Sequence, residues 1–416
     1  MSFLDRERRE CLVFQAFSYL SHLYCPTCSQ EYSAKEPAHL CQCGSPLLAA
    51  YDMDALKVQF RKETVMARPP SLWRYHELLP VKKENDIVSL GEGMTPLVEM
   101  IKTGKNYGVD HLFMKDESLL PSGSSKARGA AAGISKAKEW KITDIAMPAN
   151  GNAGAAWSLY GSRASITSHI VMPVEAPIIS RKECAAAGAD LHLVNGLIHD
   201  AGTIISHAVQ KYGWFDASPF KEPYRIEGKK TMGLELAEQL QWKLPDVIAC
   251  PVGEGAEFIG IYKAMQELME LGWVDSEKIP RLVAVQAESC APIVEAYEKH
   301  QTTADNHPES YTAAFDINVP ASIGDFLVLN AIYETKGCAV AVCEHDLLAE
   351  QRWITRKEGT FISPEGAAAF AGVRRLREEA WLHPEDTVVC VNTGMGIKSP
   401  EAFDVSVPIL AADDEL

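Results

Sequence analysis

The sequence predicts an α/β protein with parallel sheets, organised in two such domains behind a small N-terminal segment. Two observations support this prediction. Apolar segments with strand character alternate with amphipathic or alanine-rich helical segments, at the spacing typical of βαβ units. The chain also has 416 residues, 47% of them hydrophobic, which exceeds one ordinary core and suffices for two or three.

Composition narrows the range of partners and locations. The net charge is −16 at pH 7, which argues against binding to nucleic acid or to an anionic membrane surface. No apolar run approaches the length of a membrane span, and no signal-type cleavage site follows the charged N-terminus. We therefore expect a cytoplasmic protein whose eleven cysteines serve as thiols or metal ligands rather than as disulfides.

Residues 1–60 contain two short cysteine pairs about a dozen residues apart, namely Cys25, Cys28, Cys41 and Cys43. Two such knuckles supply the four soft ligands of a tetrahedral Zn²⁺ site, so the pattern indicates a zinc-ribbon-like segment. The second pair is spaced C-x-C rather than the commoner C-x-x-C, and His39 is an alternative fourth ligand. A ribbon with four free thiols and no metal is the competing interpretation.

The strand–helix alternation then defines two larger domains. Residues 61–90 are polar and read as a connecting arm, and a strand precedes the turn-rich segment Pro121–Ser125. Strands and helices alternate over residues 126–215 and again after Glu222. We predict a large domain made of residues 61–125 and 216–416, with a smaller domain of residues 126–215 inserted in it.

Lys126 stands at the start of a predicted helix, directly after the turn-rich segment Pro121–Ser125. The positive end of the helix dipole disfavours a cation there and is expected to lower the pKa of its ammonium group. A lysine with a lowered pKa is suited to forming a Schiff base. The alternative is an ordinary solvated lysine, because most lysines are exposed.

Three loops rich in glycine or asparagine follow predicted strands, at residues 148–154, 252–257 and 392–396. Ligands bind beyond the carboxyl ends of the strands in open parallel sheets, so the three loops are expected to face one crevice. The loop that begins at Val252 precedes a helix, where glycines let backbone N–H groups approach a phosphate. Taken alone, each loop is equally well read as a simple turn.

The order of these features, lysine, asparagine loop, glycine loop and Thr-Gly loop, resembles that of fold-type II enzymes that use pyridoxal phosphate. Within them the chain is similar to the threonine synthases. The similar blocks are SLGEGMTPL from Ser89, MKDESLLPSGSSKARGA around Lys126, PYRIEGKKTMGLELAEQL from Pro223, PDVIACPVGEG from Pro245 and NTGMGIK from Asn392. The resemblance spans nearly the whole chain, including the cysteine-bearing lead-in.

This resemblance implies a tryptophan synthase β-like fold, with pyridoxal phosphate held between two parallel-sheet domains. Lys126 would bind the cofactor covalently and act as the catalytic base. Asn152 would contact the phenolic oxygen of the ring and Thr393 its nitrogen. The cofactor-binding residues implied are Lys126, Asn152, Gly253, Glu254, Gly255, Ala256, Glu257 and Thr393.

The resemblance also implies an amino-acid substrate and a homodimer. The implied substrate-binding residues are Ser124, Arg128 and Asn150, with Lys229 and Lys230 as further candidates for a substrate phosphate or carboxylate. The expected reaction is that of threonine synthase, in which O-phospho-L-homoserine and water give L-threonine and phosphate. Pyridoxal phosphate is therefore the expected cofactor, and zinc the second one if the ribbon is metallated.

Several positions depart from the family pattern. Ala127 stands where a carboxylate usually separates the lysine from the arginine, so we expect Arg128 to lack the partner that aims it. Asn150 replaces a small hydroxyl residue, and Glu254 and Glu257 bring negative charge to the phosphate loop. These departures favour a less anionic substrate. The alternatives are a β-eliminase or β-replacement enzyme, such as a serine/threonine dehydratase or a cysteate synthase-like protein, and a zinc-ribbon binding module without turnover.

Overall fold

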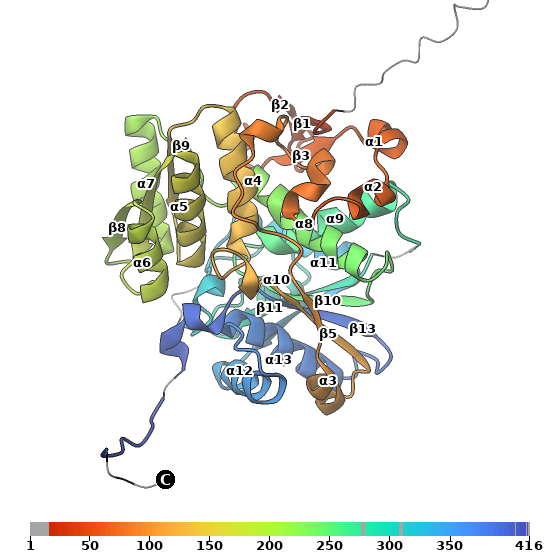
Figure 1. Ribbon diagram of the computed structural model, residues 1–416, viewed down its shortest axis with the longest axis vertical. Coiled ribbons are helices and arrows are strands. Elements are labelled where there is room, and N and C mark those ends of the chain that lie inside the picture. The colour runs from red at the N-terminus through yellow and green to blue at the C-terminus, as the bar shows by residue number, and fades with distance from the viewer. Residues whose placement is uncertain (1–15, 276–278, 308–310, 404, 413, 415–416) are drawn as a thin grey trace, which may run out of the picture.

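Three sheets organise the molecule in the computed structural model, which describes residues 16–275, 279–307, 311–403, 405–412 and 414 (Figure 1). The smallest is an antiparallel N-terminal sheet of order β2-β1-β3, formed by β1 (Leu20–Tyr24), β2 (Glu31–Ser33) and β3 (Leu48–Tyr51). The other two are parallel except at one edge strand. The predicted α/β class is thereby confirmed.

The large sheet has six strands in the order β12-β11-β10-β13-β5-β4. Its strands are β4 (Leu97–Glu99), β5 (His111–Asp116), β10 (Val247–Pro251), β11 (Arg281–Ala287), β12 (Cys338–Val342) and β13 (Thr387–Asn392). Both faces are covered, because alternate residues of one strand enter different cores. Val247 and Ala249 pack on one side, and Ile248 and Cys250 on the other.

Helices cover each face of this sheet (Figure 1). On one side lie α3 (Ile101–Tyr107), α12 (Glu344–Glu358) and α13 (Pro364–Glu378). On the other lie α8 (Tyr224–Gln239), α9 (Ala256–Glu270), α10 (Pro292–Glu298) and α11 (Asp325–Glu334). Short 3₁₀ turns fill the connections, among them η3 (Glu117–Leu119), η4 (Phe315–Ile317), η5 (Gly396–Lys398) and η6 (Pro400–Ala402).

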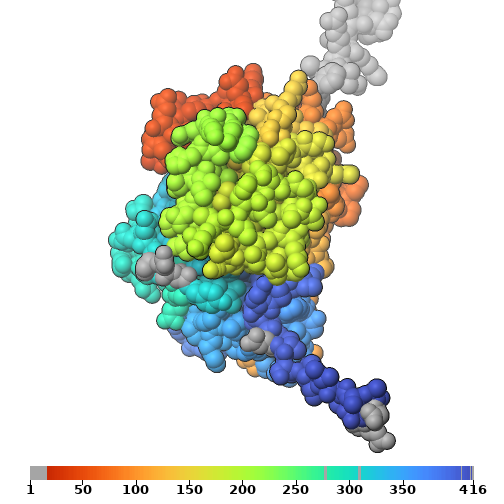
Figure 2. Space-filling model, turned by 90° about the vertical axis from the view of Figure 1, so that its left-hand side faces the viewer, coloured from red at the N-terminus to blue at the C-terminus, as the bar shows by residue number. Residues whose placement is uncertain are grey.

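The second parallel sheet has four strands in the order β8-β7-β6-β9. These strands are β6 (Asp144–Pro148), β7 (Thr167–Pro173), β8 (Asp190–Val194) and β9 (Phe215–Asp216). One face packs against α4 (Lys126–Glu139), α5 (Asn152–Ala164) and α6 (Ile178–Ala186), and the other against α7 (Ile198–Tyr212). This unit, coloured yellow to green, faces the viewer in Figure 2. The domain boundaries at 125/126 and 215/216 stay predictions.

The connecting arm and α8 differ in detail from the sequence prediction. The arm contains α2 (Lys62–Met66), η1 (Leu72–Leu78) and η2 (Glu84–Asp86), and it is preceded by α1 (Met53–Gln59). The segment TMGLELAEQL predicts a helix from Thr231, whereas in the structure that helix begins earlier, at Tyr224. Glu222 accounts for the earlier start, because its carboxylate accepts hydrogen bonds from the backbone N–H groups of Tyr224 and Arg225.

Within the part of the chain that the structure describes, no helix is both long enough and apolar enough to cross a membrane.

Candidate active site

Lys126 is the first residue of α4, as the sequence predicted, and its side chain opens into a cavity of about 860 Å³ between the two parallel sheets. The carboxyl ends of β6, β10 and β13 border this cavity. The three loops predicted to share a crevice therefore do so, with Asn150, Gly253 and Thr393 in its wall. Much of the remaining wall comes from α7, from residues 218–221 and from residues 316–323.

The glycine loop leads from β10 into the N-terminus of α9. Gly255 has φ of 100°, a conformation that strongly favours glycine. A Cβ on Gly253 would lie 2.6 Å from the carbonyl oxygen of Asp316, so the close passage of η4 also requires a glycine there. The first N–H groups of a helix lack acceptors within the helix and point outward. The loop therefore presents backbone donors that suit a phosphate.

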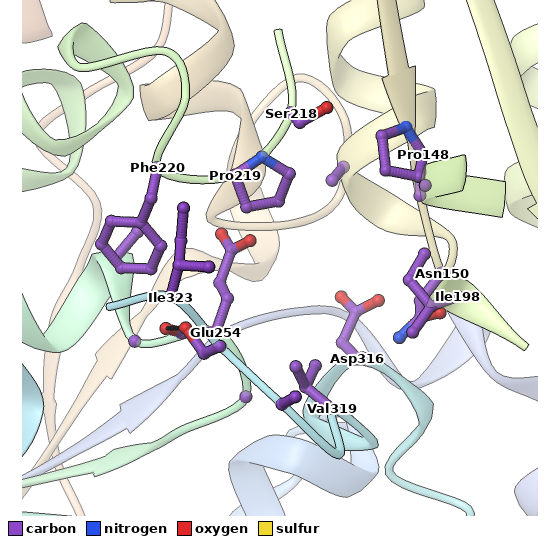
Figure 3. Close-up of a pocket in the computed structure, with 18 of the residues that line it drawn as sticks. Pro148, Asn150, Ile198, Ser218, Pro219, Phe220, Glu254, Asp316, Val319 and Ile323 are labelled. Atoms are coloured by element: carbon purple, nitrogen blue, oxygen red, sulfur yellow. Dashed lines mark hydrogen bonds between the residues drawn. The ribbon is translucent and has the colours of Figure 1, made fainter. Parts of the chain in front are cut away.

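Four carboxylates surround Lys126. A phosphate-binding glycine loop does not by itself require acidic neighbours, so this acidity is a separate feature of the pocket. The Lys126 Nζ lies 3.9 Å from Glu257 Oε2 and 3.8 Å from Asp316 Oδ2. Glu254 and Glu365 also line the cavity. Figure 3 shows Glu254 and Asp316 entering the same space from separate segments. Lys126 is thus the centre of an acidic pocket.

These carboxylates decide the protonation of the lysine. Burial lowers the pKa of Lys126, but Glu257, Asp316, Glu254 and Glu365 outweigh burial and raise that pKa above its ordinary value. The expectation that the helix dipole would lower it is therefore wrong. The combined attraction of four nearby carboxylates for the ammonium group is stronger than the helix-dipole effect, which is typically below about 1 kcal/mol.

The pKa values of two of these carboxyl groups are shifted in opposite directions. Burial raises the pKa of Glu257, but Lys126 and Lys229 prevail and lower it to about 2. Burial and the neighbouring Asp316 raise the pKa of Glu365 to about 7. Glu257 is therefore an anion with close cations, whereas Glu365 is a buried carboxyl group that lies beside another acid.

Asp316 also contacts the second expected cofactor residue. The Nδ2 of Asn152 donates to Asp316 Oδ2 at 2.8 Å, the same oxygen that faces Lys126. The backbone N–H of Asp316 donates to Glu365 Oε1 at 3.1 Å. Asp316 therefore links α4, α5 and the N-terminus of α13 across the cavity. Asn150 makes a similar crossing, since its Nδ2 donates to the carbonyl of Asn318 at 3.2 Å.

The structure places Ser124 beside the pocket rather than in its wall. Ser124 is buried and pairs through its backbone with Gly394, next to Thr393, in an isolated β-bridge. The backbone N–H of Ser125 donates to the carbonyl of Thr393 at 2.9 Å. These bonds fix the lysine segment against the end of β13, which brings Lys126 and Thr393 to the same cavity.

Arg128, expected to bind substrate, lies in a buried ion network away from the cavity. Its guanidinium contacts Glu117 at 2.5 and 2.8 Å and Glu235 at 2.7 Å, and its side chain is fully buried. The expectation that Arg128 lacks a partner beside Ala127 is wrong, because two carboxylates hold it. The structure gives it a role in packing α4 on α8.

The two lysine candidates on α8 separate in the same way. Lys229 lines the cavity and binds Glu257 Oε1 at 2.7 Å. Lys230 points into the interior, where its Nζ lies 2.5 Å from Glu227 and 2.9 Å from Glu267. Only Lys229 of the pair can face a bound molecule.

The four cysteines of the N-terminal sheet form one cluster, with their sulfur atoms all within 4.8 Å of one another. Cys25 Sγ and Cys43 Sγ are 3.5 Å apart, and Cys28 Sγ and Cys41 Sγ are 3.4 Å apart. A tetrahedral zinc site with Zn–S bonds of about 2.3 Å needs sulfurs about 3.8 Å apart, so the donor set fits such an ion.

His39, the alternative ligand, is engaged elsewhere. Its Nδ1 lies 3.0 Å from the carbonyl oxygen of Lys221, and its ring packs against Phe215.

Two acidic residues of the site were missed by sequence reasoning. Asp316 lies in a connection for which the sequence predicts no element, and Glu365 begins the segment EGAAAFAGVRRLREEA, which predicts only a helix. Neither belongs to a recognisable motif. Their position in the pocket depends on the packing of η4 and α13 beside β13, which only the tertiary fold reveals.

Comparison with known proteins gives consistent results. The profile of the family described as "Pyridoxal-phosphate dependent enzyme" matches residues 88–394. A threonine synthase of Methanocaldococcus jannaschii is 32% identical over 380 residues, covering 91% of this chain and 93% of that protein. A threonine synthase of Methanosarcina acetivorans is 33% identical over 384 residues, with the same coverage.

Among solved structures, a threonine deaminase of Solanum lycopersicum superposes with a TM-score of 0.64. It covers 88% of this chain and 97% of its own, with 20% sequence identity. At that identity the similarity concerns the fold.

Proposed function

Because the chain belongs to the threonine synthase family of pyridoxal-phosphate-dependent enzymes, we propose that it is a lyase that removes a side-chain group from an amino acid. The expected fold-type II architecture is confirmed by the same family match and by similarity to solved structures. The observation that carries the proposal is Lys126 at the start of α4, opening into the cavity opposite the N-terminus of α9.

The residues around the cavity fit this cofactor. Lys126 would hold it covalently, and the backbone N–H groups of Gly253 to Glu257 would take its phosphate. The carboxylates of Glu254 and Glu257 are compatible with a phosphate in this loop, because each has a cation nearby. Glu257 pairs with Lys229 at 2.7 Å, and Glu254 lies 3.8 Å from Arg225. Asn152 and Thr393 offer polar atoms for the ring. When bound, pyridoxal phosphate supplies an electron sink for negative charge at Cα.

Lys126 has a second role in this proposal. When it is not bound to the cofactor, its amine would be free to take the proton from Cα as a general base. Its position at the first turn of α4 and the surrounding carboxylates keep it facing the cavity. The expected consequence is that this one side chain serves both cofactor retention and proton transfer.

The reaction suggested by the curated relatives is that of threonine synthase, with O-phospho-L-homoserine and water giving L-threonine and phosphate. Sequence identity of 32–33% over 91% of the chain supports this assignment. Release of inorganic phosphate from O-phospho-L-homoserine by the cofactor-loaded protein tests it directly. Absence of phosphate release from an otherwise active preparation would contradict it.

A second candidate is β-elimination or β-replacement on a less anionic amino acid, as in a dehydratase or a cysteate synthase-like enzyme. The observation that favours it is the ring of four carboxylates in the pocket wall. Formation of a 2-oxo acid and ammonia from serine or threonine would identify such an enzyme. A protein without turnover differs from both in having no visible absorbance of bound cofactor.

Three further properties belong to the proposal. The cysteine cluster would bind one zinc ion, supported by four converging sulfurs. A homodimeric state and a cytoplasmic location, expected from the resemblance and from composition, are measured by light scattering and by fractionation. None of the three is needed for the chemistry proposed at Lys126.

A further inference from the structure

The acidity of the pocket bears on which amino acid it accepts. The inference drawn from it rests on the lyase function proposed above, and it favours the second candidate, an enzyme for a less anionic amino acid, over the reaction with O-phospho-L-homoserine. The site itself is defined by the cavity, Lys126 and the family match, so the carboxylates bear only on which amino acid it accepts. The acids in its wall are Glu254, Glu257, Asp316 and Glu365. A pocket built to take a cofactor phosphate and a substrate carboxylate has no evident need of them.

The cations of the pocket are already committed. Lysines alone supply the permanent positive charge among the described lining residues, at positions 126, 221 and 229. Lys229 binds Glu257 at 2.7 Å, and Lys221 binds Asp216 at 3.0 Å. Lys126 would be used to hold the cofactor. A phosphorylated amino acid would bring a second phosphate into a cavity with no uncommitted lysine, next to acids that repel it.

Glu257 pairs with Lys229, and Glu254 lies near Arg225. Among the described residues, Asp316 and Glu365 have no cation nearby other than Lys126. Asp316 faces Lys126 Nζ at 3.8 Å, and its N–H donates to Glu365, which is only 3% exposed. The structure therefore shows a primary ammonium group, that of Lys126, held beside this acidic pair. When the lysine amine is engaged elsewhere, the pair can accept another ammonium group at the same side of the cavity.

We propose that Asp316 and Glu365 recognise the substrate side chain, and that the substrate is an α-amino acid with a cationic, amine-bearing side chain rather than a phosphate ester. The wall formed by α7 and residues 316–323 leaves room for that side chain within the cavity. The cofactor phosphate would lie at the backbone N–H groups of the glycine loop, and the acidic pair would take the cationic end of the substrate side chain.

The test uses the full-length protein loaded with pyridoxal phosphate. Visible absorbance that is lost in Lys126→Ala establishes the proposed function first. The same band then reports the binding of a matched three-carbon series, namely L-2,3-diaminopropionate, L-serine and O-phospho-L-serine. Four-carbon L-2,4-diaminobutyrate and O-phospho-L-homoserine extend it. We expect the diamino acids to bind at least about tenfold more tightly than the phosphorylated ones, as one charge-assisted hydrogen bond gives.

Two variants assign the preference to the acidic pair. Asp316→Asn and Glu365→Gln keep size and remove charge, and each should reduce the preference for the diamino acid about tenfold. Glu344→Gln is the matched control. Glu344 accepts hydrogen bonds from Thr312 Oγ1 and the Ala313 N–H, so its substitution loosens the segment that carries Asp316 without changing the charge of the pocket.

The possible outcomes distinguish a failure of this inference from a failure of the proposed function. A lysine-dependent band with tighter binding of O-phospho-L-homoserine overturns this inference and leaves the proposed function standing. A preference that persists in both Asp316→Asn and Glu365→Gln overturns the role of the acidic pair. Absence of a lysine-dependent band overturns the proposed function and this inference together. If Glu365→Gln does not fold, Asp316→Asn decides alone, because Asp316 is less enclosed.

Discussion

Lys126 balances an acidic pocket, so its substitution changes both chemistry and charge. Lys126→Ala should lose turnover and the visible band of bound cofactor, because no amine remains to hold it. The fold should persist, since the nearest carboxylates lie 3.8 and 3.9 Å away, beyond hydrogen-bond distance. Absorbance and circular dichroism measure the two effects. Lys126→Arg is the control that keeps the positive charge, and either variant retaining the band would exclude Lys126 as the anchor.

Glu365 gives the cofactor-free protein a pH dependence of stability. Its pKa is raised to about 7 in the folded state, against about 4.3 for an unperturbed glutamate. The folded state thus binds more protons between these values, and stability falls as pH rises through about 7. Asp316 and Lys126 are the charged groups that face it from η4 and α4.

The matching measurement is the melting temperature at pH 5, 6, 7 and 8. The wild-type melting temperature should fall more steeply with pH than that of Glu365→Gln. Each kcal/mol of unfolding free energy that the wild type loses corresponds to about 2–4 °C in melting temperature. Glu344→Gln, outside the pocket, should keep the wild-type slope. Parallel curves for the wild type and Glu365→Gln would exclude Glu365 as the titrating group.

At the scale of elements, a buried charge network helps to join α4 to α8. Arg128 lies between Glu117 and Glu235, and all three side chains are fully buried. Arg128→Met should lower the free energy of unfolding by about 3–5 kcal/mol, because two carboxylates then lose their common cation. Chemical denaturation measures this. Lys138→Ala, at a half-buried position of the same helix where Nζ donates to the carbonyl of Asn85, should cost only about 1 kcal/mol.

Ala127 belongs to the same element and carries a related prediction. Its side chain is fully buried, so Ala127→Asp places a third carboxylate near the Arg128 network. We expect loss of stability instead of a gain in activity on O-phospho-L-homoserine, because Arg128 already has its partners. A folded variant with raised activity on this substrate would contradict the structural role given to Arg128.

The sequence reveals those parts of the site that local chemistry determines. Turn residues before Lys126, and glycine or asparagine after strand ends, locate the lysine and the three loops. The sequence does not predict the start of α8. Glu222, whose carboxylate accepts from the first N–H groups of this helix, precedes Pro223, and the buried charged residues that follow obscure the apolar pattern. The role of Asp316 is not predicted for a different reason. Its significance arises from two segments far apart in sequence meeting across a cavity, and no local pattern encodes that.

At the scale of the whole molecule, the N-terminal sheet is packed against the frame of the pocket. The ring of Tyr51 on β3 lies over the Nζ of Lys230, at 4.1 Å, and of Lys263, at 4.8 Å. These lysines belong to α8 and α9 and share the buried Glu227. Helix α9 begins at the glycine loop, so the cysteine-bearing sheet supports the helix that would hold the cofactor phosphate.

This arrangement predicts that metal in the cysteine cluster stabilises more than the N-terminal segment. Metal analysis should find about one zinc per chain, and Cys25→Ser should lower zinc content and the melting temperature. Hydrogen exchange should then quicken in β1 to β3 first and in α8 and α9 next, because Tyr51 links them. Cys184→Ser is the control, since Cys184 is buried in the core beside the four-stranded sheet, away from the cluster. A metal-free protein whose stability and exchange match those of Cys25→Ser would mean that the ribbon packs on α8 and α9 without needing an ion.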